Sequence, residues 1–442
     1  MNIPSYAKTA LTLLKKNGYT AYCVGGCVRD YIMGNSANDY DITTSALPEK
    51  AKEIFADYKN FDQGIKHGTL SVLIEGNVLE ITTYRIDGKY KDNRHPEAVI
   101  FSDRIEDDLS RRDFTVNAIA CDLSGNYIDP FGGFGDIENK IIRCVGKPTD
   151  RFKEDALRIL RAIRFSSVLD FKIEENTAIA IHECKDLLCN ISKERIYSEF
   201  VKLLSGVNVR SVLSEYSDVI SVFIPEIIPC IGFDQKNKYH CYNVYEHICA
   251  SVEAIAPTPI LRQTMFFHDI GKPKCFFEDE NGGHFHNHNK VSAEISHNVL
   301  KALKASNNTV KQVEILVYHH DAMRCFTKKS IRRLIAKIGE ENVRLLFSIE
   351  RADASAQAPE ITGQRMELSM KREKIFNEIL NEKPCFSIKS LEINGNDLKT
   401  LDIDGIQIGT VLKKLFEEVL DNTLENKHEE LIKRAKEIKN EE

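Results

Sequence analysis

Two aspartates and a nearby pair of glycines are the first residues in this sequence that could do chemistry together. Asp39 and Asp41 stand two residues apart, and Gly25 and Gly26 end a short apolar run ahead of a predicted helix. On a strand, side chains at i and i+2 share a face, so the two carboxylates would lie roughly 6–7 Å apart and could share divalent cations. Backbone amides at a glycine pair before a helix can bind a phosphate. A phosphate-binding turn beside two metal-binding carboxylates is typical of a nucleotidyl transferase.

A second set of polar residues could select a nucleotide base. Between residues 154 and 165 an aspartate and three arginines recur every three residues, and a helix over 151–168 would place them on one ridge. The set comprises Asp155, Arg158, Arg161 and Arg164. An aspartate acceptor with an arginine donor matches cytosine and adenine, while guanine and uracil would leave buried polar groups unpaired at about 1–3 kcal/mol each. The alternative is a salt-bridged amphipathic helix with no part in recognition.

Length and composition describe an ordinary globular chain. The 442 residues are 42% hydrophobic and 29% charged, which predicts two to four domains. No apolar run approaches the ~20 residues of a membrane span, and the N-terminus lacks the pattern of a signal peptide. The twelve cysteines include no C-x-x-C pair, which favours a reducing cytoplasm. The net charge of −6 leaves nucleic-acid binding open, because such binding depends on clustered lysines and arginines.

The hydrophobic pattern changes near residue 147. Before it, short β-branched runs alternate with helical segments, and Glu75-Gly76-Asn77 predicts a hairpin turn between two strands. Beyond it, the helical period dominates. The expected fold class is α+β, with a small mixed α/β head followed by an elongated all-α region. The expected domains are a catalytic head at 1–147, a helical neck at 148–235, a third domain at 236–330 and a helical tail at 331–442.

The head resembles the DNA polymerase β-like nucleotidyltransferase superfamily. Its phrases GGCVRD, DYDI, RRDFTVNA and EDALRILRAIRF are similar to those of bacterial class II CCA-adding tRNA nucleotidyltransferases. The resemblance is continuous from about Tyr22 to Phe165 and weaker beyond. It implies template-independent addition of CCA to tRNA from CTP and ATP, with Mg²⁺ held by Asp39 and Asp41. The nucleotide-binding residues that it implies are Gly26, Arg29, Arg112, Asp155, Arg158, Arg161 and Arg164.

Two related activities are alternatives within this superfamily. A poly(A) polymerase of the bacterial type would carry a G-R-R-F-R phrase, where this chain has Ile65-Lys66-His67-Gly68-Thr69. A CC-adding enzyme would have a shortened loop after the hairpin, but the loop from Arg85 to Arg94 has its full length. Addition of the terminal A alone is not excluded by that loop.

A histidine–aspartate pair indicates a second metal site. His268-Asp269 follows an apolar helix, and its separate partners at His247, His288 and Asp321 resemble the HD phosphohydrolase superfamily. The resemblance implies His247, His268, Asp269 and Asp321 as the core ligands, with His288 and His320 as candidate ligands of a second ion. Nitrogen and carboxylate ligands together suit Mn, Fe, Ni or Zn.

This third domain could serve in two other ways. It could be a fold kept only for tRNA docking, or a phosphohydrolase that is the main activity beside a vestigial head. The partners expected for the leading interpretation are tRNA, CTP and ATP, without a membrane, and the expected location is the cytoplasm.

Overall fold

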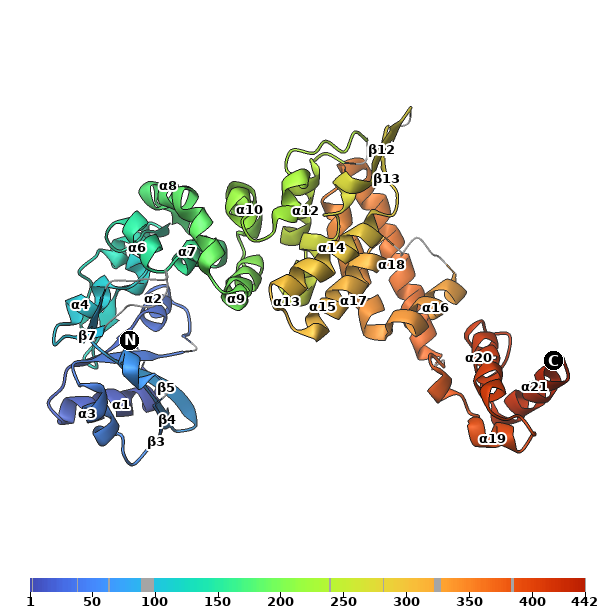
Figure 1. Cartoon of the computed structure of the whole chain (residues 1–442), viewed down its shortest axis with the longest axis horizontal. Helices are drawn as coiled ribbons and strands as arrows, with labels where there is room; N and C mark the ends of the chain where they lie inside the picture. Colours follow the sequence, from blue (N-terminus) through green and yellow to red (C-terminus); the bar gives the residue numbers. More distant parts are fainter. Residues whose placement is uncertain are drawn as a thin grey trace. The chain divides into compact units, whose positions relative to one another are not determined.

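The chain forms two compact units, Met1–Pro225 and Glu226–Glu442, each with its own buried core (Figure 1). The computed structural model describes residues 1, 3–37, 39–62, 64–88, 99–237, 240–280, 282–321, 327–382 and 385–441. The larger sheet belongs to the first unit and most of the second unit is helical, so the predicted α+β class is confirmed. Among the described helices, none is long and apolar enough to cross a membrane. The four-domain division remains a prediction.

Seven strands within the described residues form one sheet in the order β3-β4-β5-β2-β1-β8-β9. They are β1 Ala21–Val24, β2 Asp41–Thr44, β3 Lys59–Phe61, β4 Thr69–Ile74, β5 Asn77–Thr83, β8 Ala120–Cys121 and β9 Tyr127–Ile128. β4 and β5 form the predicted hairpin, and both turn residues, Glu75 and Gly76, have positive φ. β2 lies in the middle of the sheet, parallel to β5 and antiparallel to β1. Its first residue, Asp41, therefore lies between Val24 of β1 and Glu80 of β5.

Two short strands follow the hairpin. β6 (Arg85–Asp87) pairs with β7 (Val99–Phe101), which closes the ends of the predicted loop into a ribbon. Residues 89–98, which include most of that loop, lie outside the described residues.

Short helices cover the sheet, and longer ones follow it in the chain. The α-helices of the first unit are α1 Ser5–Lys16, α2 Gly26–Ile32, α3 Pro48–Ile54, α4 Ile105–Ser110, α5 Gly133–Glu138, α6 Pro148–Glu154, α7 Leu157–Leu169, α8 Glu175–Cys184, α9 Lys193–Leu204, α10 Val209–Glu215 and α11 Ser217–Ile220. A 3₁₀ turn, Thr115–Asn117, links α4 to β8, and β10 (Ile141–Ile142) pairs with β11 (Lys172–Ile173). α7 packs on α9, and this pair follows the sheet-bearing head.

The helix expected over 151–168 is interrupted. Asp155 has φ −135° and ψ 103°, an extended conformation that separates α6 from α7. Its Oδ1 accepts the N–H of Leu157 at 3.1 Å, the kind of bond that satisfies a helix start. The single-helix prediction was therefore wrong at this point, because Asp155 stands before α7 while the three arginines stand on it.

The second unit is built mainly from helices. They are α12 Val244–Ala254, α13 Pro259–Phe267, α14 His288–Ala302, α15 Asn307–His319, α16 Lys328–Ile338, α17 Glu340–Ser355, α18 Pro359–Asn381, α19 Gly395–Lys399, α20 Ile406–Leu420 and α21 His428–Glu441. A capping box at Asn243 starts α12, and the side chains of Ser306 and Thr327 cap α15 and α16. α17 packs against α12, α13 and α15, so four helices converge on one core. A hairpin of β12 (Phe276–Asp279) and β13 (Gly282–Phe285) was not predicted from the sequence.

Gly133 provides a test of how tightly α5 packs on the 3₁₀ turn. A Cβ at Gly133 would lie 2.3 Å from the carbonyl oxygen of Thr115 and 2.8 Å from Ile119 Cγ1, whereas a Cβ at Gly135 would meet nothing within 4 Å. We expect Gly133→Ala to lower the free energy of unfolding by about 1–3 kcal/mol because the turn must move. Gly135→Ala, on the same helix, should change it by less than about 1 kcal/mol. Urea unfolding of both variants checks this, and equal effects would contradict it.

Candidate active site and metal centre

Of the two aspartates expected to hold Mg²⁺, Asp41 is the one that lies within the sheet. It is the first residue of β2, opposite Val24 of β1 and beside Glu80 of the parallel strand β5. Asp39 is exposed and precedes the strand, which begins two residues later than expected. Although Asp41 reaches solvent, the surrounding protein raises the pKa of its carboxyl. The negative charge of Asp39 raises this pKa further, and the Arg112 guanidinium lowers it. Burial raises the pKa of Glu80 as well, and the negative charge of Asp41 raises it further. Carboxylates that repel one another in this way favour a divalent cation among them.

The glycine pair lies next to Arg112. Gly25 has φ +81°, a conformation that side chains rarely adopt, and a Cβ there would lie 3.0 Å from Arg112 Nη1. Gly26 is the first residue of α2. Arg112 also contacts the buried carboxylate of Asp108 at 3.4 Å, which holds the guanidinium close to the glycine turn. Two residues that the resemblance assigns to nucleotide binding, Gly26 and Arg112, therefore lie on either side of Gly25.

A chain of polar contacts connects α2 to α7. Arg29 donates to Asn117 Oδ1 at 2.7 Å, and Asn117 donates to Asp113 Oδ1 at 3.3 Å. Asp113 Oδ2 accepts from Arg161, with Nη2 at 2.6 Å. Burial alone would raise the pKa of Asp113, but the Arg161 charge and these hydrogen bonds lower it to about 2. The candidate nucleotide-binding residues Arg29 and Arg161 thus belong to one network.

Asp155 and Arg158, the aspartate and the nearest arginine of the set expected to select the base, each have protein partners. Asp155 accepts from Leu157 N–H and from Arg195 Nη2 at 3.0 Å. Arg158 is buried and donates to Glu154 at 2.7 Å and to the carbonyl oxygen of Arg111 at 3.0 Å. The side chains are thus held in place in the absence of a nucleotide.

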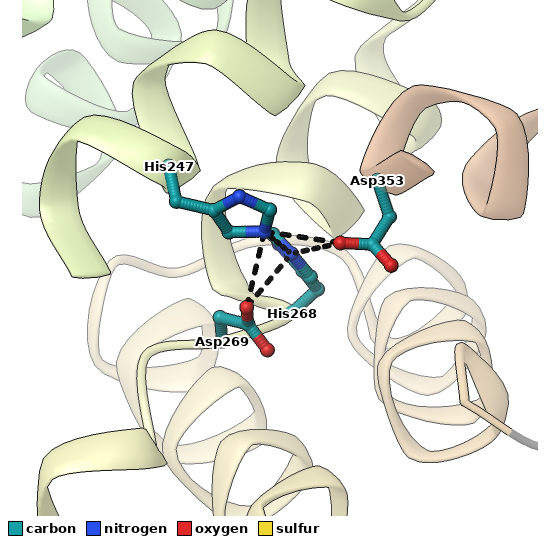
Figure 2. A group of neighbouring side chains, drawn as sticks. All are labelled: His247, His268, Asp269 and Asp353. Carbon is teal, nitrogen blue, oxygen red and sulfur yellow. Dashed lines mark hydrogen bonds and ion pairs between the residues drawn. The ribbon is translucent and has the colours of Figure 1, made fainter. Parts of the chain in front are cut away.

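Four side chains of the second unit form a buried cluster, shown in Figure 2. His247 comes from α12, His268 and Asp269 follow α13, and Asp353 comes from α17. The Nε2 atoms of the two histidines are 3.2 Å apart, and Asp269 Oδ2 lies 3.2 Å from each. Asp353 Oδ1 is 3.0 Å from His247 Nε2. One ligand atom from each residue lies within 4.8 Å of the others, a spacing that suits one metal ion.

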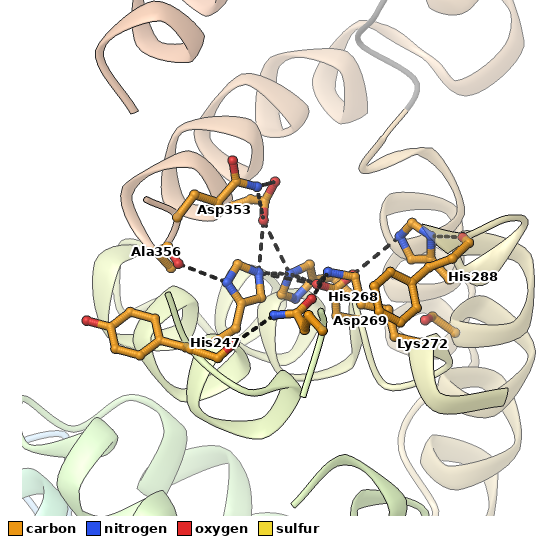
Figure 3. Close-up of polar contacts among 12 residues, drawn as sticks. His247, His268, Asp269, Lys272, His288, Asp353 and Ala356 are labelled. Atoms are coloured by element: carbon orange, nitrogen blue, oxygen red, sulfur yellow. Dashed lines mark hydrogen bonds and ion pairs between the residues drawn. The ribbon is translucent and has the colours of Figure 1, made fainter. Parts of the chain in front are cut away.

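Backbone carbonyls orient the histidines of this cluster (Figure 3). His247 Nδ1 lies 3.0 Å from the carbonyl oxygen of Ala356, and His268 Nδ1 lies 2.7 Å from that of Met265. Each Nδ1 therefore carries the proton, and each Nε2 lone pair faces the other across 3.2 Å. A positive charge at this point relieves the repulsion. Burial opposes a charge on His268, but the carboxylates of Asp269 and Asp353 raise the pKa of its imidazole to about 10.

A second group of possible ligands shares Asp269. Its Oδ1 lies 3.3 Å from His288 Nε2 and 3.7 Å from His320 Nε2, and these two nitrogens are 3.2 Å apart. Their Nδ1 atoms again lie near backbone carbonyl oxygens, those of Phe285 and Val317. Asp269 therefore spans the two groups, one carboxylate oxygen to each.

The fourth residue of the first group differs from the one expected. Asp321 is not in either group, and Asp353 supplies the carboxylate instead. Asp321 lines the adjoining cavity of about 340 Å³, to which Lys272 and Arg365 also contribute. Sequence reasoning missed Asp353 because it stands in a charged helical run, Glu350–Asp353, that carries no motif. Only the packing of α17 on α12 and α13 brings it to the histidines.

Comparisons with known proteins identify the relatives of this chain. Family models match the poly A polymerase head domain at residues 21–143, the RNA and SrmB-binding site of polymerase A at 170–227, and tRNA nucleotidyltransferase domain 2 at 285–435. A CCA-adding enzyme of Ligilactobacillus salivarius is 36% identical over 99% of this chain and 98% of its own length. The chain belongs to the family of CCA-adding enzymes.

Other members of the CCA-adding family are similar over the same extent. The enzyme of Enterococcus faecalis is 33% identical over 98% of this chain and 97% of its own. The crystal structure of the Bacillus stearothermophilus CCA-adding enzyme in complex with CTP superposes with a TM-score of 0.74 at 29% identity, covering 99% of this chain and 97% of that one. The family likeness therefore extends through the helical second unit.

The Asp113–Arg161 pair gives a pH-dependent prediction. Because the folded-state pKa of Asp113 is lowered to about 2, its ionised form stabilises the fold above about pH 4, and this stabilisation is lost as the pH falls towards 2. Asp113→Asn should lower the free energy of unfolding at pH 7 by about 2 kcal/mol, and the difference from wild type should shrink below pH 4. Urea unfolding between pH 2 and 7 measures this. The exposed Asp57→Asn serves as control, and a difference that stays constant with pH would contradict the assignment.

Proposed function

We propose that the chain adds CCA to the 3′ end of tRNA without a nucleic-acid template, using CTP and ATP. The observation that carries this proposal is the position of Asp41 on the central strand, beside Glu80 and facing Arg112. Membership of the CCA-adding family supports it, and so does the likeness to the CTP complex of the Bacillus stearothermophilus enzyme.

The proposed reaction is attack by the tRNA 3′ oxygen on the α-phosphorus of a nucleoside triphosphate. A bond forms between that oxygen and the phosphorus, the α–β phosphoanhydride bond breaks, and pyrophosphate leaves. The carboxylate oxygens of Asp39 and Asp41 suit Mg²⁺, which would activate the attacking hydroxyl and neutralise the triphosphate when bound. Arg112 and the amide of Gly26 would bind phosphate oxygens close to these carboxylates, whereas the Gly25 N–H already donates to the carbonyl oxygen of Ile119 at 3.3 Å.

Incorporation assays separate this function from its alternatives. With tRNA ending before CCA, we expect two C residues from CTP, one A from ATP after them, and no addition to a complete end. Asp41→Asn should lower the rate at least about 10²-fold, because a neutral amide oxygen binds Mg²⁺ more weakly than a carboxylate. Unlimited addition of A would instead favour a poly(A) polymerase, and A addition only to ends that already carry CC would favour an A-adding enzyme.

Asp155 and Arg158 are the proposed base-selecting pair. We expect Asp155→Ala or Arg158→Ala to raise the incorporation of UTP or GTP relative to CTP and ATP by about tenfold or more, since a mismatched base no longer buries an unpaired group. Competition assays with all four nucleotides measure this ratio. Lys153→Ala, one turn earlier on the exposed face of α6, is the control. Unchanged discrimination in both variants would refute the base-reader hypothesis.

We propose a second function for the cluster in the other unit, metal-dependent hydrolysis of phosphate esters. The favouring observation is that four histidines hold Nδ1 against a backbone carbonyl and direct Nε2 to a shared carboxylate, Asp269. Such ligands suit Mn, Fe, Ni or Zn, and an ion in each group would place the two metals on either side of Asp269. Lys272 and Arg365 line the cavity beside the cluster, where Lys272 pairs with Asp269 Oδ2 at 2.6 Å and Arg365 with Asp353 Oδ2 at 3.0 Å. An ion bound by these carboxylates would compete with both pairs and leave the two cations to a phosphate.

Metal analysis tests this second function separately from nucleotide addition. After loading with Mn²⁺ and gel filtration, we expect two ions per wild-type chain, about one in His320→Ala, and fewer than one in Asp269→Asn, because only Asp269 serves both groups. Hydrolysis of p-nitrophenyl phosphate should fall with metal content, whereas CCA addition with Mg²⁺ should not change. His284→Ala, a cavity residue outside both groups, is the control. A metal-free wild-type chain would exclude the centre.

A further inference from the structure

Phe165 lies at the meeting point of three arginines. The guanidinium carbon of Arg164 lies 3.7 Å from the centre of the Phe165 ring, and those of Arg29 and Arg161 lie at 5.2 Å and 5.4 Å. Arg29 belongs to α2, while Arg161 and Arg164 belong to α7 with Phe165 itself. All three distances fall within the range of cation–π attraction.

The ring is itself held rigidly. Phe165 is 6% exposed, and its ring meets the buried Phe114 ring edge-on at 5.8 Å. Phe114 follows Asp113, the carboxylate that pairs with Arg161. Arg29 and Arg161 therefore contact both the polar network around Asp113 and the Phe165 ring.

Each of the three arginines also pairs with a carboxylate: Arg29 with Asp30 at 2.6 Å, Arg161 with Asp113 at 2.6 Å and Arg164 with Glu199 at 2.7 Å. Burial lowers the pKa of the Arg164 guanidinium, Glu199 opposes this, and the charges of Arg161 and Arg29 lower it further. The electron-rich face of Phe165 attracts all three without adding a negative charge that would repel a triphosphate.

We propose that Phe165 is a positioning residue of nucleotide addition, holding Arg29, Arg161 and Arg164 together as a triphosphate-binding set. The inference rests on the proposed function of the head. Phe165 acts only through the arginines, so it affects the binding of every nucleotide equally and contributes nothing to base choice. Its loss leaves the carboxylates of the metal site and the base-selecting pair in place.

Steady-state incorporation by Phe165→Leu and Phe165→Met tests this role. Both side chains fill most of the volume but lack a π face, and we expect KM for CTP and ATP to rise together by about tenfold. The turnover number should change less than threefold, and the preference against UTP and GTP should persist. Phe165→Tyr keeps the ring and should restore KM to within about twofold of wild type.

A matched variant separates positioning from general destabilisation. Ile159→Val removes a methylene from the fully buried core of the same helix and should lower the melting temperature without raising KM. An unchanged KM in the leucine and methionine variants, or a tyrosine variant as impaired as they are, would overturn the proposal. Inactive wild-type protein would instead overturn nucleotide addition itself. If one of the two ring-deletion variants fails to fold, the other still decides.

Discussion

The ion pair between Asp113 and Arg161 joins the sheet-bearing head to the first long helix that follows it. Asp113 stands in the segment between α4 and the 3₁₀ turn, and Arg161 stands on α7. A buried carboxylate is tolerated only with compensating charge and hydrogen bonds, which Arg161, Asn117 and the Phe114 amide provide. Because Asn117 also accepts from Arg29, the same pair fixes a residue on α2. Separating the head from α7 would therefore leave buried charges on both sides.

In the metal-ligand cluster, buried side chains are likewise fixed by polar partners, but the partners differ. Here the fixed groups are imidazoles, and backbone carbonyls replace charged partners as the orienting elements. One of those carbonyls, at Ala356, lies where α17 ends, only three residues beyond the ligand Asp353. The ligands thus come from α12, from α17 and from the residues that follow α13, and these helices pack on one another.

Sequence patterns predicted the head better than the cluster. The β4–β5 hairpin could be predicted because the local turn signal at Glu75-Gly76-Asn77 agrees with the tertiary fold. The break at Asp155 could not, since Leu157 and its neighbours continue a helical period and only the Asp155 backbone departs from it. Asp353 was missed for the opposite reason: its local signal is a plain charged helix, and its burial depends on neighbours about a hundred residues earlier. Chemistry carried by residues close together in the chain is visible in one sequence, whereas a ligand supplied by packing alone is not.

The proposed role of Asp155 in base selection has a thermodynamic consequence. A carboxylate accepts about four hydrogen bonds, and those from Leu157 and Arg195 use one on each oxygen. Acceptor capacity remains for a base while the start of α7 stays capped. The side-chain entropy of this acceptor is therefore lost once, when the chain folds, and not again at each nucleotide-binding event. Discrimination between bases can then draw on the full enthalpy of the hydrogen bonds, in an enzyme that must choose three nucleotides in succession for every tRNA.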